Sequence, residues 1–309
     1  MPDILCLGEP MLEFNQQPAG ADGRRLYLEG HGGDTSNAAI AAARSGASVG
    51  YVSAIGRDGP GDSFLALWER EGVDAATVKH DDGAATGIYF VTHDERGHHF
   101  TFYRGGSAAS RFGPDDVPVD AIRQAKVLHL SGISQAISDS ACDAGFRAME
   151  VAKAAGVAVS YDTNLRLRLW PVARAAAVIH AAIGMADIAL PSMDDATALT
   201  GLTEPDAVVD FYLRLAPLVL LKCGKAGAIV ATRQARTRIP GVTVQAVDAT
   251  GAGDTFAGAF LARHVAGDDA VTAAWYANAA AALSTTGYGA VAPIPRDAAV
   301  RALLARGGD

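Results

Sequence analysis

The chain contains 309 residues, of which 50% are hydrophobic and 19% are charged, and its formal net charge is −8. This apolar content excludes an intrinsically disordered segment, and the length suits one large α/β domain or two modest ones. No run of about 18 apolar residues occurs, so we expect no transmembrane span. The acidic balance argues against sequence-independent binding of nucleic acids.

The first residues and the cysteines indicate a cytoplasmic protein. No basic region precedes the apolar segment 4–7, so we predict no signal peptide. Cys6, Cys142 and Cys223 are odd in number and far apart. This usage is typical of buried thiols in a reducing compartment rather than of a disulfide framework or a zinc site.

Short apolar runs alternate with helical patterns along the chain. The runs that we expect to form strands are 4–7, 49–55, 127–131, 157–162, 188–191, 218–222, 228–232 and 243–247. The expected helices are 36–45, 61–71, 138–155, 173–185, 194–200, 207–215, 253–265 and 269–284. This alternation is typical of βαβ units and predicts a mainly parallel sheet with helices on both faces.

Two segments, 11–30 and 87–104, interrupt this pattern because their apolar residues alternate with a period of two. The second segment has the pattern of a hairpin that turns at about 94–97. Together the segments 11–30 and 87–104 predict either an edge extension of the main sheet or a small β lid that excludes water from a site. Since no internal repeat and no long linker occurs, we expect a single domain over residues 1–309.

The segment 247–260 carries the clearest chemical pattern. Gly251 and Gly253 permit a tight turn after an expected strand, and a helix is predicted from about residue 253. The free amides at the start of a helix bind anions, and Asp254 would lie beside them. The carboxylate of Asp254 would then accept the proton of an attacking hydroxyl. The alternative is an ordinary acidic residue in the first turn of a helix.

The segment 248–256 (DATGAGDTF) resembles the C-terminal signature of the ribokinase/PfkB family of carbohydrate kinases, with Ala249 in place of the usual Thr. The segments 32–39 (GGDTSNAA) and 55–61 (IGRDGPG) resemble the family's N-terminal signature, in the family's order. The resemblance covers essentially the whole chain. It implies a ribokinase-like three-layer α/β/α fold with a small β lid, ATP as phosphoryl donor and Mg²⁺, and it allows a monovalent cation.

The same resemblance implies a nucleotide site near 222–228 (KCGKAGA), although this segment is also a good hairpin turn. The resemblance also implies that the backbone amides of Gly251, Ala252 and Gly253 stabilise the transferring phosphoryl group. Asp254 would be the catalytic base. The residues implied to bind the nucleotide are Asn164, Ser192, Lys222, Gly224, Lys225, Gly227, Thr250, Gly251, Gly253 and Asn278. Asp195 stands where the family has Glu, and it would act on Mg²⁺ through water.

The segments 103–109 (YRGGSAA) and 162–170 (DTNLRLRLW) resemble those of the 2-keto-3-deoxygluconate kinases within this family. An arginine that follows a parallel strand would point toward the site, and its planar fork matches a carboxylate. The alternative is a set of solvated surface charges. The residues implied to bind the acceptor are Gly33, Asn37, Tyr89, Tyr103, Arg104 and Arg166.

We therefore predict an ATP-dependent kinase that phosphorylates 2-keto-3-deoxygluconate at its 6-hydroxyl, and we expect a homo-oligomer that pairs through the lid strands. A fructokinase, a ribokinase or another PfkB member is the first alternative. A dinucleotide-dependent dehydrogenase would need G-x-G-x-x-G after the first strand, where the chain has Gly8, Glu9 and Pro10. A non-catalytic sugar sensor is the third alternative, and an intact segment 251–254 argues against it.

Overall fold

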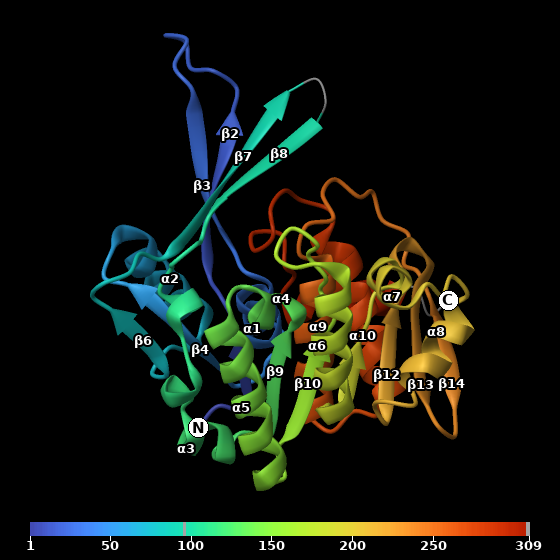
Figure 1. Cartoon of the computed structure of the whole chain (residues 1–309). Coiled ribbons are helices and arrows are strands. Elements are labelled where there is room, and N and C mark those ends of the chain that lie inside the picture. Colours follow the sequence, from blue (N-terminus) through green and yellow to red (C-terminus); the bar gives the residue numbers. More distant parts are fainter. Residues whose placement is uncertain (95–96, 307–309) are drawn as a thin grey trace.

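A mostly parallel sheet forms the body of the molecule in the computed structural model, which describes residues 1–94 and 97–306 (Figure 1). Its strands are β1 (Ile4–Leu7), β4 (Val49–Gly56), β5 (Val73–Asp74), β6 (Val78–Asp81), β9 (Val127–Ser131), β10 (Ala158–Asp162), β11 (Ile188–Leu190), β12 (Leu218–Lys222), β13 (Gly227–Thr232) and β14 (Arg236–Pro240). The order is β14-β13-β12-β11-β10-β9-β1-β4-β5, with β6 paired to β4. The pairs β12–β13 and β13–β14 are antiparallel, and the other pairs are parallel.

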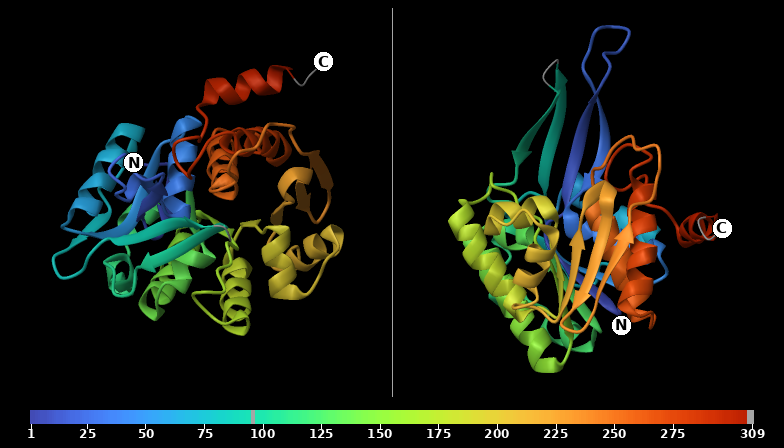
Figure 2. Two further views of the ribbon diagram at one scale, coloured as in Figure 1. Left: turned by 90° about the horizontal axis from the view of Figure 1, so that it is seen from above. Right: turned by 90° about the vertical axis from the view of Figure 1, so that its right-hand side faces the viewer.

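Helices cover both faces of this sheet. One face carries α1 (Asp34–Arg44), α2 (Gly59–Glu71), α9 (Ala252–Val265), α10 (Ala270–Ser284) and α11 (Asp297–Arg306). The other carries α3 (Val119–Gln124), α4 (Gly132–Ala136), α5 (Asp139–Ala155), α6 (Val172–Met185), α7 (Met193–Thr200) and α8 (Pro205–Tyr212). Three short 3₁₀ turns occupy Ala109–Arg111, Pro114–Asp116 and Gly224–Ala226. Figure 2 shows α11 at the outer surface of the molecule.

The central strand β1 explains why its sequence is apolar at every position. Ile4 and Cys6 join the core beneath α1, α9 and α10, whereas Leu5 and Leu7 join the core beneath α5 and α6. Each of the four side chains is at most 4% exposed. A parallel strand that is covered on both faces requires such a continuous apolar run. The predicted three-layer α/β/α architecture is therefore confirmed.

Helices α1 and α9 approach each other closely at Gly258. A Cβ atom at this position would lie 2.0 Å from the carbonyl oxygen of Ala38 and 2.8 Å from the Cβ of Ala41. Close-packed interiors do not absorb such an overlap without moving backbone. The missing side chain of Gly258 thus fixes the separation of the two helices whose N-termini carry the predicted site residues.

A second sheet has four strands, and it projects from the body (Figure 1). It contains β2 (Met11–Gln17), β3 (Leu26–Gly32), β7 (Gly87–Asp94) and β8 (Gly97–Tyr103), in the order β3-β2-β7-β8. The pair β2–β7 is parallel, and the other two pairs are antiparallel. This lid sheet is separate from the main sheet, so an edge extension is excluded. Residues 95–96 of the expected turn lie outside the described residues.

The two edge strands of the lid sheet expose large apolar side chains. These are Leu26, Tyr27 and Leu28 on β3 and Phe100, Phe102 and Tyr103 on β8. Leu28 and Tyr103 are each 62% exposed. The two inner strands also contact each other through aromatic rings, since Phe14 on β2 stacks on Phe90 on β7 with ring centroids 5.2 Å apart. The lid sheet thus combines an aromatic interior with an apolar surface.

One expected strand, 243–247, is wrong. The edge position beside β13 is taken by β14, because Gly227 pairs with Pro240 and Ala231 with Arg236. The segment 243–247 instead forms part of the connection to α9, and the Val247 amide donates to the carbonyl oxygen of Thr285 at 2.7 Å. Its alternating valines resembled a strand, but Val247 is 47% exposed.

No helix in the described part of the chain is long and apolar enough to cross a membrane.

Candidate active site

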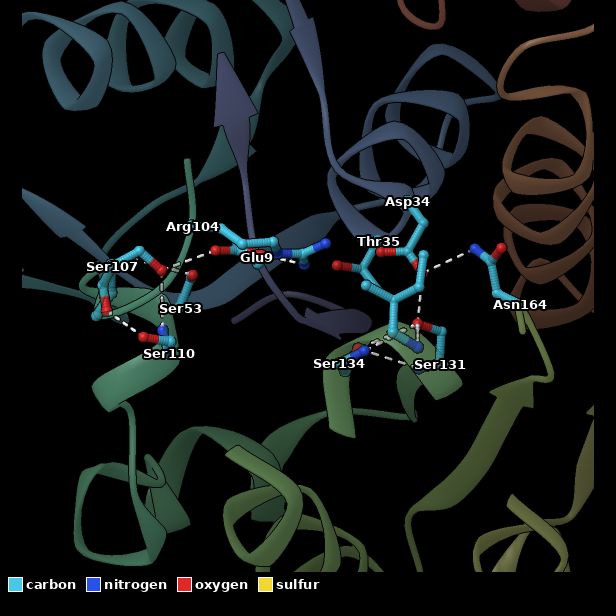
Figure 3. Close-up of polar contacts among 12 residues, drawn as sticks. Glu9, Asp34, Thr35, Ser53, Arg104, Ser107, Ser110, Ser131, Ser134 and Asn164 are labelled. Atoms are coloured by element: carbon cyan, nitrogen blue, oxygen red, sulfur yellow. Dashed lines mark hydrogen bonds and ion pairs between the residues drawn. The ribbon is translucent and has the colours of Figure 1, made fainter. Parts of the chain in front are cut away.

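Polar side chains gather where the parallel strands end. Asp162 closes β10 and Lys222 closes β12, while Asp34 and Asp254 lie in the first turns of α1 and α9. The carboxyl ends of parallel strands are the usual place for ligands in open α/β sheets. Figure 3 shows Asp34 directed toward Ser131 and Asn164 at this edge.

The N-terminus of α9 has the geometry that an anion site requires. Gly251 precedes the helix with a φ of 75°, in the left-handed region. A Cβ atom there would lie 3.0 Å from the carbonyl oxygen of Ala290. The first amides of a helix have no intrahelical partner and lie at the positive end of its dipole. The amides of Gly251 and Gly253 can therefore face negatively charged oxygens, whereas the Ala252 amide donates to the carbonyl oxygen of Ala249 at 3.2 Å.

Lys222 adds a positive charge beside this helix terminus. A Cβ atom on Gly253 would lie 3.3 Å from the Lys222 Nζ, so glycine leaves the space between them open. The Lys222 Nζ donates to the Oδ2 of Asp162 at 2.5 Å. Burial raises the pKa of Asp162, and the charge of Lys222 opposes this effect. The pair places a fixed ammonium group at the predicted phosphate position.

Asp254 is held by two amide side chains. Asn37 donates to its Oδ2 at 2.9 Å, and Asn164 approaches its Oδ1 at 3.5 Å. Burial and the neighbouring carboxylate of Asp34 raise the pKa of Asp254 to about 7, while the hydrogen bond from Asn37 and the charge of Lys222 lower it. A carboxyl group that titrates near neutral pH is suited to proton transfer.

Asp195 and Ser192 lie at the start of α7. The Ser192 Oγ accepts a hydrogen bond from the Asp195 amide at 3.2 Å, and Thr163 donates to the Asp195 Oδ2 at 2.8 Å. The described residues contain no group of three or more His, Cys, Asp or Glu that could hold a metal ion. The role of Asp195 at a metal through water stays a prediction from the sequence.

Among the other residues implied to bind the nucleotide, some support the backbone by packing or hydrogen bonds and others lie on the open surface. Gly227 is required for packing, because a Cβ atom there would lie 2.0 Å from the carbonyl oxygen of Ile239. The Asn278 side chain donates to the carbonyl oxygen of Pro240 at 2.9 Å. Lys225 and Thr250 are exposed, together with Gly224. The Thr250 hydroxyl donates to the Oδ1 of Asp248 at 2.6 Å.

Three of the predicted acceptor residues lie beside Asp254 or at the base of the lid sheet. Gly33 begins α1 with a φ of 104°, and a Cβ atom there would lie 2.4 Å from the carbonyl oxygen of Glu9. Asn37 is 4% exposed and binds Asp254. Tyr89 donates to the Oε2 of Glu13 at 2.5 Å. Burial raises the pKa of the Tyr89 hydroxyl, and the carboxylate of Glu13 adds to this shift.

Arg104 is paired rather than free. Its guanidinium donates to Glu9, whose other carboxylate oxygen accepts from Ser107 at 2.8 Å (Figure 3). Glu9 is 1% exposed, and its burial raises its pKa against the opposing effect of Arg104. In the described part of the chain the Nε of Arg104 is buried without a partner. One N–H donor of this side chain is thus unsatisfied by the described residues.

Arg166 and Tyr103 lie on the surface. Among the described residues no carboxylate pairs with Arg166, which donates to the carbonyl oxygen of Leu165 at 2.9 Å. The adjacent Arg168 donates to the carbonyl oxygen of Phe100 in the lid sheet at 3.3 Å. The loop after β10 therefore reaches the lid sheet, and no carboxylate within the described ranges compensates the Arg166 charge.

Comparison with known proteins identifies the family. The family model for pfkB carbohydrate kinases matches residues 1–297. The chain belongs to the PfkB family of carbohydrate kinases. It is 35% identical to fructokinase-1 of Zea mays over 97% of both chains. It is also 35% identical to the 2-dehydro-3-deoxygluconokinase of Thermoproteus tenax, over 96% of this chain and 93% of that protein.

Solved structures agree with this membership. An E. coli protein assigned as ribokinase II, in complex with ATP and Mg²⁺, superposes with a TM-score of 0.89 and 26% identity. The match covers 99% of this chain and all of the other. The ribokinase-like fold that the signatures implied is therefore confirmed.

Three acidic residues of this PfkB kinase lie in the site, although the sequence patterns did not single them out. Asp34 is 8% exposed and accepts hydrogen bonds from Ser131 and Asn164. Glu9 binds Arg104, and Glu13 binds Tyr89. Asp34 lies within the N-terminal signature, which is a signal that could have found it. The partners of Glu9 and Glu13 are 95 and 76 residues away, so no local pattern reveals them.

Proposed function

We propose that this PfkB kinase transfers the γ-phosphoryl group of ATP to the 6-hydroxyl of 2-keto-3-deoxygluconate. The observation that carries the proposal is the exposed guanidinium of Arg166, which has no carboxylate partner in the described residues. A planar guanidinium matches the carboxylate of a sugar acid through two parallel hydrogen bonds. A neutral sugar has less use for an uncompensated cation there. We place the enzyme in the cytoplasm, where ATP is available.

The base in this proposal is Asp254. Its carboxylate takes the proton of the acceptor hydroxyl, whose oxygen then forms a bond to the γ-phosphorus. The bond from that phosphorus to the β–γ bridging oxygen breaks, and its electron pair leaves with ADP. Asn37 orients the carboxylate through its 2.9 Å hydrogen bond. A positioned base of this kind contributes about 10²–10⁴-fold to a rate.

The residues around the α9 terminus fit a polyphosphate. The space left open at Gly253 lies between the helix amides and the Lys222 ammonium, and Gly251 holds the turn in the left-handed region. Amides and an ammonium group that are already in place stabilise charge on a transferring phosphoryl group. Bound Mg²⁺ would neutralise phosphate charge, with Asp195 acting through water.

A second candidate is a fructokinase, and one observation favours it. Two carboxylates, Glu9 and Glu13, occupy the base of the lid sheet, and Glu9 compensates the charge of Arg104. Carboxylates bind neutral sugar hydroxyls well and repel a substrate carboxylate. The two hypotheses thus differ in whether Arg166 attracts a substrate carboxylate more strongly than Glu9 and Glu13 repel it.

An acceptor panel with ATP and Mg²⁺ separates the candidates. We expect the highest kcat/KM with 2-keto-3-deoxygluconate, and Arg166→Ala should raise its KM about 10- to 100-fold with little change in kcat, since a hydrogen bond to a charged group is lost. Arg168→Ala is the matched control from the same loop and should change KM less than about threefold. A preference for fructose that Arg166→Ala leaves intact would support the second candidate.

We also propose that two copies pair through their lid sheets. The exposed apolar side chains of β3 and β8 lie on edge strands, whose unpaired backbone groups favour association. Covering Leu28 and Tyr103 would remove their apolar area from water.

A further inference from the structure

Asp34 is a buried carboxylate that the mechanism above does not use. Ser131 and Asn164 both donate to its Oδ2, the latter at 2.9 Å (Figure 3). The Oδ1 is buried and has no partner in the part of the chain that the structure describes. A buried charge with an unsatisfied oxygen costs stability, so its presence calls for a physical reason.

The side chain of Asn164 connects Asp34 to the base. Its Nδ2 lies 2.9 Å from the Asp34 Oδ2 and 3.5 Å from the Asp254 Oδ1. The loop backbone fixes this amide, because Asn164 has a φ of 26° and its own amide donates to the Oδ1 of Asp162 at 3.1 Å. One amide group is thus shared between two carboxylates, and the shorter bond goes to Asp34.

We propose that Asp34 is a positioning residue for phosphoryl transfer that acts on Asp254 through the shared amide of Asn164. The inference rests on the proposed role of Asp254 as the base. Asp34 draws the amide toward itself, so Asp254 receives only a long contact from Asn164. The negative charge of Asp34 also disfavours a second negative charge nearby. Both effects make Asp254 a stronger proton acceptor.

The other groups that face Asp254 do not by themselves account for its raised pKa. From α1 come Asp34 and the neutral amide of Asn37, from β10 comes Asp162, and from β12 comes Lys222. Asp162 and Lys222 neutralise each other in an ion pair of 2.5 Å. The hydroxyl of Tyr89 on β7 stays neutral, because burial and the carboxylate of Glu13 raise its pKa, with smaller contributions from Asp248 and Asp254. Among the charged groups that raise the pKa of Asp254, Asp34 has the largest effect.

The variant Asp34→Asn tests the inference because it removes the charge and keeps the shape. The Asn oxygen can still accept from Ser131 and Asn164, since both bonds end on one oxygen of Asp34. We expect the acidic limb of kcat/KM to move down by about one pH unit or more. The matched control is Ser131→Ala, which disturbs the same cluster and keeps the charge. Its acidic limb should stay at the wild-type pH.

A second variant predicts the opposite direction. Asn164→Ala retains both carboxylates and removes the shared donor, so the acidic limb should move to higher pH. All profiles are measured with the acceptor that the wild type phosphorylates best. The ratio of the variant's kcat/KM to that of the wild type at each pH removes the effect of ATP titration. Unchanged limbs in both Asp34→Asn and Asn164→Ala would overturn the inference.

A stability measurement gives a readout without turnover. A carboxyl group whose pKa is raised to about 7 in the folded protein binds its proton more tightly than in the unfolded chain, so stability falls as pH rises from about 4 to 7. Asp34→Asn should therefore raise the Tm relative to wild type about 2–4 °C more at pH 8 than at pH 5. An equal offset at both pH values would indicate a structural role only. Near-normal turnover of Asp254→Asn would instead contradict the proposed function.

Discussion

The two ends of the candidate site differ in how completely they are assembled. At the α9 terminus, Asp254, Asn37 and Asn164 are joined by hydrogen bonds, and Lys222 is paired with Asp162. At the lid, Tyr103 is 62% exposed, and Arg166 extends from its loop without a carboxylate partner in the described residues. The first group lies mainly on helices and strands of the main body, with Asn164 at the start of the loop after β10, whereas the second lies on an edge strand of the lid sheet and further along the same loop.

This difference separates chemistry from acceptor choice. Groups that are held before the ligand arrives need no reorganisation during transfer. Groups on a lid are brought together by the ligand, so their contribution depends on which ligand binds. Substitutions at the α9 terminus should therefore lower kcat, and substitutions at the lid should change KM and the acceptor range.

The largest effect is expected at Asp254. Asp254→Asn keeps the shape of the side chain and removes its ability to accept a proton, so kcat should fall by about 10²–10⁴-fold. Steady-state ADP release at saturating ATP and acceptor measures this. The KM for the acceptor should change little if the amide retains the contact with Asn37. If only the KM for the acceptor rises and kcat is unchanged, the proposed separation of chemistry at the α9 terminus from acceptor choice at the lid is wrong.

Gly258 tests whether the body holds the assembled end in place. In Gly258→Ala the new methyl group meets the backbone of Ala38, and such overpacking costs about 1–3 kcal/mol. We expect a Tm lower by about 2–10 °C and a reduced kcat, because α1 and α9 must separate. The control Gly184→Ala lies in α6 with no atom within 4 Å of the new methyl group, so its Tm should be equal or higher.

The lid surface should give the smallest effect on turnover. Leu28→Glu places a charge on β3 and should weaken self-association at least about tenfold, as measured by sedimentation, because a charge resists transfer to an apolar interface. The kcat should change less than about threefold. Val172→Glu is the control, since Val172 is 45% exposed and belongs to α6 rather than to the lid sheet. Equal sedimentation of both variants and the wild type would exclude pairing through the lid.

The sequence was informative where the physical cause is local. The glycines before Asp254, the apolar runs of the sheet and the period-two pattern of the lid all act over a few residues, and the corresponding elements are present. The expected strand at 243–247 failed because strand pairing is non-local, and β14 occupies the edge beside β13. The pairing of Arg104 with Glu9 was not foreseen for the same reason, since 95 residues separate them.

The tight contact at Gly258 has a consequence for the catalytic cycle. It joins the helix that carries Asn37 to the helix that carries Asp254, so the amide and the base travel as one rigid unit. We therefore expect sugar entry and product departure to leave these two helices together and to depend on movement of the projecting sheet, whose rate would then limit how fast the enzyme can cycle.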